Sequence, residues 1–160
     1  MSAAKGNPPA PSGYVALVLH AHLPYVRHPE HARSIEERWL FEAMWEVYLP
    51  LVDLLDRLHH EGVFAPISLS VSPPLAAMWQ DRWLLRRCRA HFDAVRAVGS
   101  RALSHGQAPE IAAAIRHHID LLDRAETTFE RHRGDVLSAL VAHHQNGTVE
   151  LFTTAATHGF

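Results

Sequence analysis

The sequence has only one cysteine, Cys88, and one lysine, Lys5, among its 160 residues. A single thiol can form neither an internal disulfide nor a cysteine-based zinc site, which fits a reducing cytoplasm. Lys and Arg together number 15 against 17 Asp and Glu, so no net positive field exists to hold a nucleic-acid backbone or an anionic membrane surface. We therefore expect a cytoplasmic protein with no nucleic-acid partner.

Long hydrophobic runs are also missing. The two strongest, residues 14–19 and 48–55, are far shorter than the about 18 residues that a membrane span needs, and Pro50 and Asp53 interrupt the second. Residues 1–13 have neither an apolar central region nor an A-x-A cleavage site, and their prolines and small polar residues predict a disordered leader. We expect a soluble chain with no membrane partner.

The sequence does contain alternating strand-like and helix-like segments. Short apolar or alternating runs predict strands at residues 14–19, 66–72 and 148–154. The first of these runs is continuously apolar, as in a strand buried on both faces. Apolar residues spaced by three or four predict helices over 34–62, within 79–103 and over 109–144.

Several residues mark the expected ends of these segments. Ser34 followed by Glu37 resembles a capping box at the start of the first helix, and Pro50 should bend that helix or split it in two. The prolines at 73–74 predict an exit loop after the second strand. Gly134 is a candidate break in the last helix.

Strands that alternate with helices predict an α/β protein with a parallel sheet, because only a long connection can start a parallel neighbour. The length suits one domain, which we place at residues 14–160. Three strands are too few to close a barrel, and the chain ends a few residues after the third. We therefore expect a domain that is truncated after its third strand.

Two histidines lie where the first predicted strand ends. Ligands bind at the carboxyl ends of parallel strands, and residues i and i+2 of a strand point to one side, so His20 and His22 can reach one cavity. One of these imidazoles can instead have only a structural hydrogen bond. A His-x-His pair also suits a metal hydrolase, but the later strand ends add only His158 to the ligand set.

Further candidates lie on or near the third strand and the first helix. Glu150 is flanked by apolar residues, so we expect a buried carboxylate paired with a histidine of a neighbouring strand, in a structural or a ligand-contacting role. Trp39 is a candidate for the rim of a cleft, whereas Trp45 and Trp83 are interpreted as core residues. The arginines of 82–96 are interpreted as a solvated face.

Three stretches carry a resemblance to a known family. His20-Ala-His-Leu-Pro-Tyr-Val-Arg-His28, Glu36-Glu-Arg-Trp-Leu-Phe-Glu42 and the segment 147–160, which contains Glu-Leu-Phe-Thr-Thr-Ala-Ala-Thr-His, resemble glycoside hydrolase family 57 and its 1,4-α-glucan branching enzyme group. The resemblance implies the N-terminal part of an incomplete (β/α)7 barrel of the glycoside hydrolase/deacetylase type, with a helical excursion between the second and third strands. It also implies retaining transfer of α-1,4 to α-1,6 linkages in glycogen biosynthesis.

The resemblance assigns the nucleophile and the acid/base to later strands, so it implies no catalytic residue in this chain and no activity of the chain alone. It implies an α-1,4-glucan substrate, no cofactor and no required metal. It assigns His20, His22, Glu150 and His158 to the subsite around the reacting sugar. The alternatives are a family 57 α-amylase or 4-α-glucanotransferase, a His-x-His metal hydrolase, and a non-catalytic glucan-binding remnant.

Overall fold

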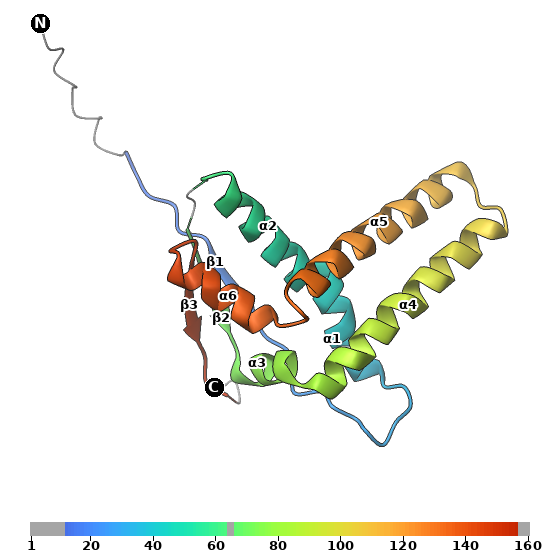
Figure 1. The fold of residues 1–160 in the computed structure, drawn as a ribbon, viewed down its shortest axis with the longest axis horizontal. Coiled ribbons are helices and arrows are strands. Elements are labelled where there is room, and N and C mark those ends of the chain that lie inside the picture. The colour runs from blue at the N-terminus through green and yellow to red at the C-terminus, as the bar shows by residue number, and fades with distance from the viewer. Residues whose placement is uncertain (1–11, 64–65, 157–160) are drawn as a thin grey trace, which may run out of the picture.

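The computed structural model describes residues 12–63 and 66–156, and in this part of the chain three strands form one parallel sheet. They are β1 (Val18–Ala21), β2 (Ile67–Val71) and β3 (Val149–Thr153), in the order β1-β2-β3. Helices form both connections (Figure 1), because the chain must return to the same end of the sheet before each parallel strand. The predicted α/β class is confirmed.

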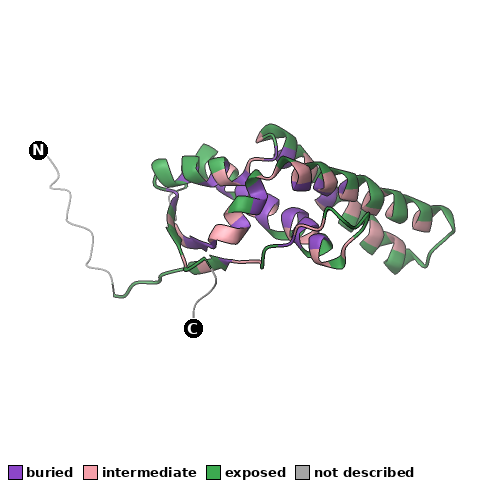
Figure 2. Ribbon diagram, turned by 90° about the horizontal axis from the view of Figure 1, so that it is seen from below, coloured by how far each residue is buried: buried purple, intermediate pink, exposed green. Residues whose placement is uncertain are grey.

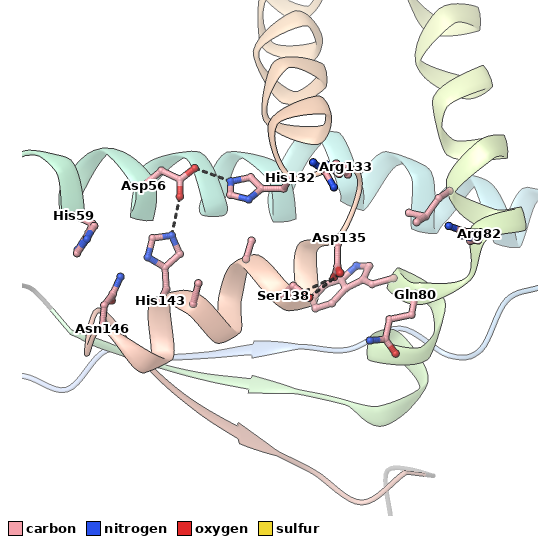
Figure 3. A pocket seen from close by; sticks show the side chains of 14 residues that line it. Asp56, His59, Gln80, Arg82, His132, Arg133, Asp135, Ser138, His143 and Asn146 are labelled. Carbon is pink, nitrogen blue, oxygen red and sulfur yellow. Dashed lines mark hydrogen bonds and ion pairs between the residues drawn. The ribbon is translucent and has the colours of Figure 1, made fainter.

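The two connections differ in size. The first contains α1 (Ile35–Ala43), a π-helical turn (Met44–Tyr48) and α2 (Leu49–His60). The second contains α3 (Pro73–Gln80), α4 (Arg82–Ser104), α5 (Pro109–Arg131) and α6 (Val136–Gln145). Helices α4 and α5 form an antiparallel pair that extends away from the sheet, whereas α6 lies beside the strands (Figures 1 and 3). The expected helical excursion between β2 and β3 is therefore present.

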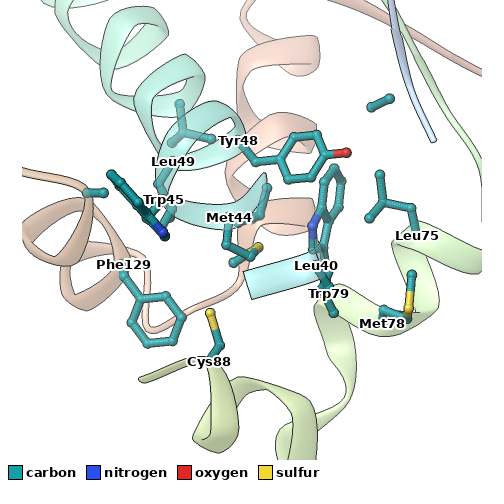
Figure 4. Close-up of a cluster of buried hydrophobic side chains, with 14 of the residues drawn as sticks. Leu40, Met44, Trp45, Tyr48, Leu49, Leu75, Met78, Trp79, Cys88 and Phe129 are labelled. Atoms are coloured by element: carbon teal, nitrogen blue, oxygen red, sulfur yellow. The ribbon is translucent and has the colours of Figure 1, made fainter. Parts of the chain in front are cut away.

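The hydrophobic core lies where the helices meet one face of the sheet. The sheet contributes the buried side chain of Leu69 to this core, and the helices contribute the buried side chains of Trp79, Trp45 and Met44 (Figure 4). Burial is concentrated at this junction, and the outer part of the α4–α5 pair is largely exposed (Figure 2). The expectation that Trp45 is a core residue is confirmed.

The first strand differs from its prediction. It begins at Val18 rather than Tyr14, and Tyr14 and Val15 are 91% and 99% exposed. A strand exists only where a neighbour pairs with its backbone, and the register pairs β2 with residues 18–21 alone. The prediction that this strand is buried on both faces is also wrong, because Val18 is 60% exposed on the face that the described helices leave open.

The predicted exit loop at Pro73 and Pro74 is wrong as well. These residues form the first turn of α3, so only Ser72 separates β2 from that helix. Proline is favoured in a first helical turn, because its missing N–H would have no helical partner there and its fixed φ suits the helix. A proline pair after a strand therefore predicts a helix start as well as it predicts a loop.

The other breaks agree with the sequence. Pro50 cannot donate a hydrogen bond, and the helix is split just before it by the π-helical turn, in which the N–H of Leu49 donates to the carbonyl of Met44. Gly134 adopts a φ of 75° between α5 and α6. Most of the predicted leader, residues 1–11, lies outside the described residues.

Candidate functional site

The face of the sheet opposite the core carries two of the predicted site residues, His20 and Glu150. Successive residues of a strand point to opposite faces of the sheet. Residues paired across the three strands form one rung, and the rung of Leu19, Leu69 and Leu151 points toward the core. The two neighbouring rungs therefore share the other face, which we call the open face. Its members across the three strands are Val18, Ser68 and Glu150 in one rung and His20, Ser70 and Phe152 in the next.

Hydrogen bonds between strands hold the polar members of the open face. His20 Nδ1 lies 3.2 Å from Ser70 Oγ on β2, and Ser70 is itself buried. The Ser68 hydroxyl donates to Glu150 Oε2 at 2.7 Å. These contacts orient an imidazole on β1 and a carboxylate on β3 on the same face of the sheet, which suits the binding of a polyhydroxylated ligand, since both groups hydrogen-bond hydroxyls.

His20 and His22 lie together, as their spacing predicts. Their rings are stacked with centroids 5.9 Å apart and an interplanar angle of 6°. Residue 22 follows the last residue of β1, so its ring extends the row at the carboxyl end of the strand, the end at which parallel α/β folds bind ligands. The placement of these two side chains next to each other is confirmed, whereas the shared cavity and the role in binding stay predictions.

Glu150 differs from its prediction. Its side chain is exposed rather than buried, and its recorded partner is a serine rather than a histidine. The register explains the partner, because Ser68 lies directly opposite Glu150, whereas His20 lies one rung further along and on the far side of β2. No buried charge needs compensation here.

The loop that follows β1 is fixed by a buried ion pair. The Glu37 carboxylate is fully buried, accepts the backbone N–H of His28 at 2.7 Å, and lies 2.6 Å from a guanidinium nitrogen of Arg87. Arg87 also donates to the carbonyls of His31 and Ala32. The capping box is therefore only half formed, because Ser34 caps the helix while Glu37 serves the loop.

Two guanidinium groups lie over the Trp83 ring, those of Arg27 at 4.9 Å and Arg87 at 4.6 Å from its centroid. The Arg27 guanidinium also forms an ion pair with the Asp81 carboxylate at 2.8 Å. The interpretation of Trp83 as a core residue holds only in part, because the side chain packs against the core but is half-buried, with these cations over its ring. The interpretation of the arginines as a solvated face is also wrong for Arg87, whose cation neutralises Glu37.

The remaining predicted site residues are not brought to the open face by the described contacts. Trp39 lies on α1 and is 48% exposed, which fits a rim position but does not test it. His158 lies outside the described residues. Glu150 is the one carboxylate on the three described strands, so no pair of carboxyl groups lies on them.

Within residues 12–63 and 66–156, no group of three or more His, Cys, Asp or Glu side chains is arranged to hold a metal ion. The same ranges contain no helix that is both long enough and apolar enough to cross a bilayer.

Comparison with known proteins gives the family. The sequence profile of glycosyl hydrolase family 57 matches residues 16–160, and the chain belongs to this family. The 1,4-alpha-glucan branching enzyme TK1436 of Thermococcus kodakarensis is 31% identical over 149 residues, which cover 92% of this chain and 22% of that protein. A probable 1,4-alpha-glucan branching enzyme of Mycobacterium tuberculosis is 36% identical over 74 residues, 46% of this chain and 14% of that protein.

Solved structures agree with the sequence comparison. The branching enzyme of Pyrococcus horikoshii matches with a TM-score of 0.86 at 31% identity, covering 92% of this chain and 28% of that one. TK1436, crystallised with glucose, matches with a TM-score of 0.84 over 92% of this chain and 26% of that one. The α-amylase AmyC of Thermotoga maritima matches at 0.82 and 29% identity, covering 91% and 28%. The chain thus spans about a quarter of the length of these relatives.

Some residues that shape this site escaped the sequence reasoning. Ser68 and Ser70 alternate with the apolar residues of β2, and that alternation is the signal of a polar sheet face. Glu37 reads as an ordinary acidic residue of a first helical turn, because its partner Arg87 is 50 residues away. No local pattern reveals such a pair.

Proposed function

We propose that this chain is the N-terminal segment of a 1,4-α-glucan branching enzyme and that its open face holds sugar units of an α-1,4-glucan. The observation that carries the proposal is the 31% identity to a branching enzyme over 92% of the chain. The row of His20, Ser70, Ser68 and Glu150 supports it, because these groups offer both donors and acceptors to sugar hydroxyls.

The proposal gives each residue a positioning role. His20, His22 and His158 hydrogen-bond hydroxyls of the reacting sugar, Glu150 accepts from another hydroxyl, and Trp39 forms the rim. We also propose that the three strands begin an incomplete (β/α)7 barrel that occupies residues 14–160, and that the protein is cytoplasmic and acts in glycogen biosynthesis. The proposal includes no cofactor and no metal.

The chain alone should not transfer or hydrolyse glucan. Retaining chemistry needs two carboxyl groups about 5 to 5.5 Å apart, one as nucleophile and one as acid/base. The described strands supply only Glu150, which is hydrogen-bonded to Ser68. Incubation of the chain with amylose should yield neither new reducing ends nor branch points. Turnover that His20→Ala abolishes would contradict this expectation.

Binding tests the site directly. Maltoheptaose titrated into the 160-residue chain should shift the NMR signals of His20 and His22, and His20→Ala should weaken that binding. His105→Ala is the matched control, because His105 is an exposed residue that ends α4 far from the sheet. Saturable binding that is unchanged in His20→Ala would contradict the proposal that the open face is the binding site. Stoichiometric zinc in untagged protein would favour the metal hydrolase.

A chimera distinguishes branching from hydrolysis. Residues 14–160 replace the corresponding part of the Thermococcus kodakarensis branching enzyme, and the products from amylose are analysed. New α-1,6 branch points support the proposal. Reducing ends without branches favour an α-amylase, the activity of the Thermotoga maritima relative that matches with a TM-score of 0.82.

A further inference from the structure

The segment 22–25, which directly follows β1 and includes one of the two stacked histidines, is anchored at both ends. On one side, the carbonyl of Ala21 accepts the N–H of Ser72 at 3.0 Å, beside the paired strands β1 and β2. On the other side, Val26 is 4% exposed and its N–H donates to Met78 Sδ at 3.2 Å. The segment therefore connects a strand end to a buried point on α3, so its position depends on both anchors.

Arg27 extends the second anchor to the start of α4. Its Nε lies 2.8 Å from Asp81 Oδ2, and its guanidinium lies 4.9 Å from the centroid of the Trp83 ring. The side chains of Arg27 and Asp81 are 34% and 21% exposed, so water only partly screens the pair. An arginine that is both paired with a carboxylate and stacked on an aromatic ring has a fixed orientation. The loop at Arg27 is thereby held against the α3–α4 junction.

Asp81 uses its two carboxylate oxygens for two different tasks. Oδ1 accepts the N–H of Trp83 at 2.7 Å and that of Leu84 at 3.2 Å, which caps the N-terminus of α4. Oδ2 accepts from Arg27. Burial alone raises the pKa of Asp81, but the hydrogen bonds from Leu84, Trp83 and Arg27 outweigh burial and lower that pKa. The carboxylate is therefore ionised at neutral pH, and an asparagine at this position can keep the cap while it loses the ion pair.

Three consecutive residues of the loop are bound by three different helices. Val26 is bound by α3, Arg27 by the residue that caps α4, and His28 by Glu37 of α1. The two ionic contacts differ in burial, because Glu37 is fully buried whereas the Arg27–Asp81 pair is partly exposed. A partly exposed ion pair contributes little to global stability. Loss of the Arg27–Asp81 pair should therefore loosen the loop beside the anchored segment without unfolding the chain.

We propose that Arg27 and Asp81 are positioning residues that hold His22 in the geometry in which it binds a glucan hydroxyl. The inference rests on the proposed function, because it concerns the same sugar site. His22 stacks on His20 and belongs to the loop that Arg27 anchors, so a shift of this loop changes the outer end of the histidine row. A loop that is already ordered before the ligand arrives need not be ordered during binding, so the anchor increases the affinity.

Titration of the 160-residue chain with maltoheptaose tests the proposal in Asp81→Asn and Arg27→Gln. Asparagine caps a helix about as well as aspartate, so Asp81→Asn removes the ion pair and keeps the cap. We expect each variant to bind about threefold to tenfold more weakly at a nearly unchanged Tm, because binding must then order the loop. Arg27→Lys keeps the charge and should restore part of the affinity that Arg27→Gln loses. Asp135→Asn is the matched control, since Asp135 caps α6 through the Ser138 N–H at 2.9 Å and forms no ion pair with a described residue.

A second measurement does not depend on the ligand. In the free Asp81→Asn chain, the NMR signals of the His22 ring should shift and amide exchange at Val26 should accelerate, whereas Asp135→Asn should change neither. Weaker binding with shifted His22 signals at an unchanged Tm supports the proposal. If the unmodified chain binds no maltoheptaose, the glucan site is contradicted, and the His22 signals still test the positioning. Unchanged His22 signals, unchanged affinity, an equal effect of Asp135→Asn, or a loss of affinity that only follows a fall in Tm would overturn it.

Discussion

Replacing Arg87 with alanine should destabilise the chain by leaving Glu37 buried without a cation. Glu37 is fully buried and lies 2.6 Å from the Arg87 guanidinium, and in the variant it keeps only the His28 N–H as a recorded partner. Removing one member of a buried pair costs about 3 to 5 kcal/mol. Because the Arg87 side chain is itself 25% exposed, we expect the lower end, about 3 kcal/mol.

That loss is large against the total stability of a domain, which is about 5 to 15 kcal/mol. For a chain of this size it corresponds to a fall in Tm of roughly 6 to 12 °C. Urea unfolding followed by tryptophan fluorescence measures the free energy, and the Trp83 ring under Arg87 reports the local change. Amide exchange at His31 should also accelerate, because its N–H donates to the His28 carbonyl within a loop that loses the Arg87 hydrogen bonds to the carbonyls of His31 and Ala32.

Arg86→Ala is the control for the loss of a charge on the same helix. Arg86 is exposed and has no ion pair with a described residue, so its substitution should change stability by no more than about 0.5 kcal/mol. A loss below about 1 kcal/mol for Arg87→Ala would refute the argument that Glu37 depends on this cation. So would equal effects of the two variants.

Three further predictions use other features. Gly134→Ala should cost about 2 to 4 kcal/mol in urea unfolding, because φ is 75° there and an added Cβ would lie 2.8 Å from the Phe129 ring; unchanged stability would contradict this. Burial alone raises the pKa of Asp56, but its hydrogen bonds outweigh burial and hold that pKa below 3.8. The ionised Asp56 carboxylate therefore stabilises the fold above pH 3.8, and this stabilisation is lost as the pH falls through the lowered pKa. The stability of Asp56→Asn relative to the unmodified chain should accordingly be lowest at neutral pH, and the difference should shrink as the pH falls below 3.8. A difference that does not change with pH would contradict this argument. In the chimera, His20→Ala should lower kcat by at least about 10²-fold, roughly 2.7 kcal/mol, with an unchanged Tm; activity within a few-fold of the parent would remove His20 from the sugar site.

The sequence by itself determined the elements and the family. Hydrophobic spacing located the three strands and the helical segments between them, because period and propensity are local properties of the chain. The break at Gly134 and the split near Pro50 were also predictable, since each residue imposes its own backbone constraint. The motif around His20 and His22 indicated family 57, and the family comparison confirmed it.

Only the tertiary structure decided what pairs with what. The partners of Glu37, Asp56 and Glu150 lie 50, 87 and 82 residues away along the chain, so no local pattern selects Arg87, His143 or Ser68 for them. The exposure of Glu150 likewise depends on which face of the sheet the helices cover. Strand pairing and helix packing bring these residues together, and they alone decide which face of the sheet stays open.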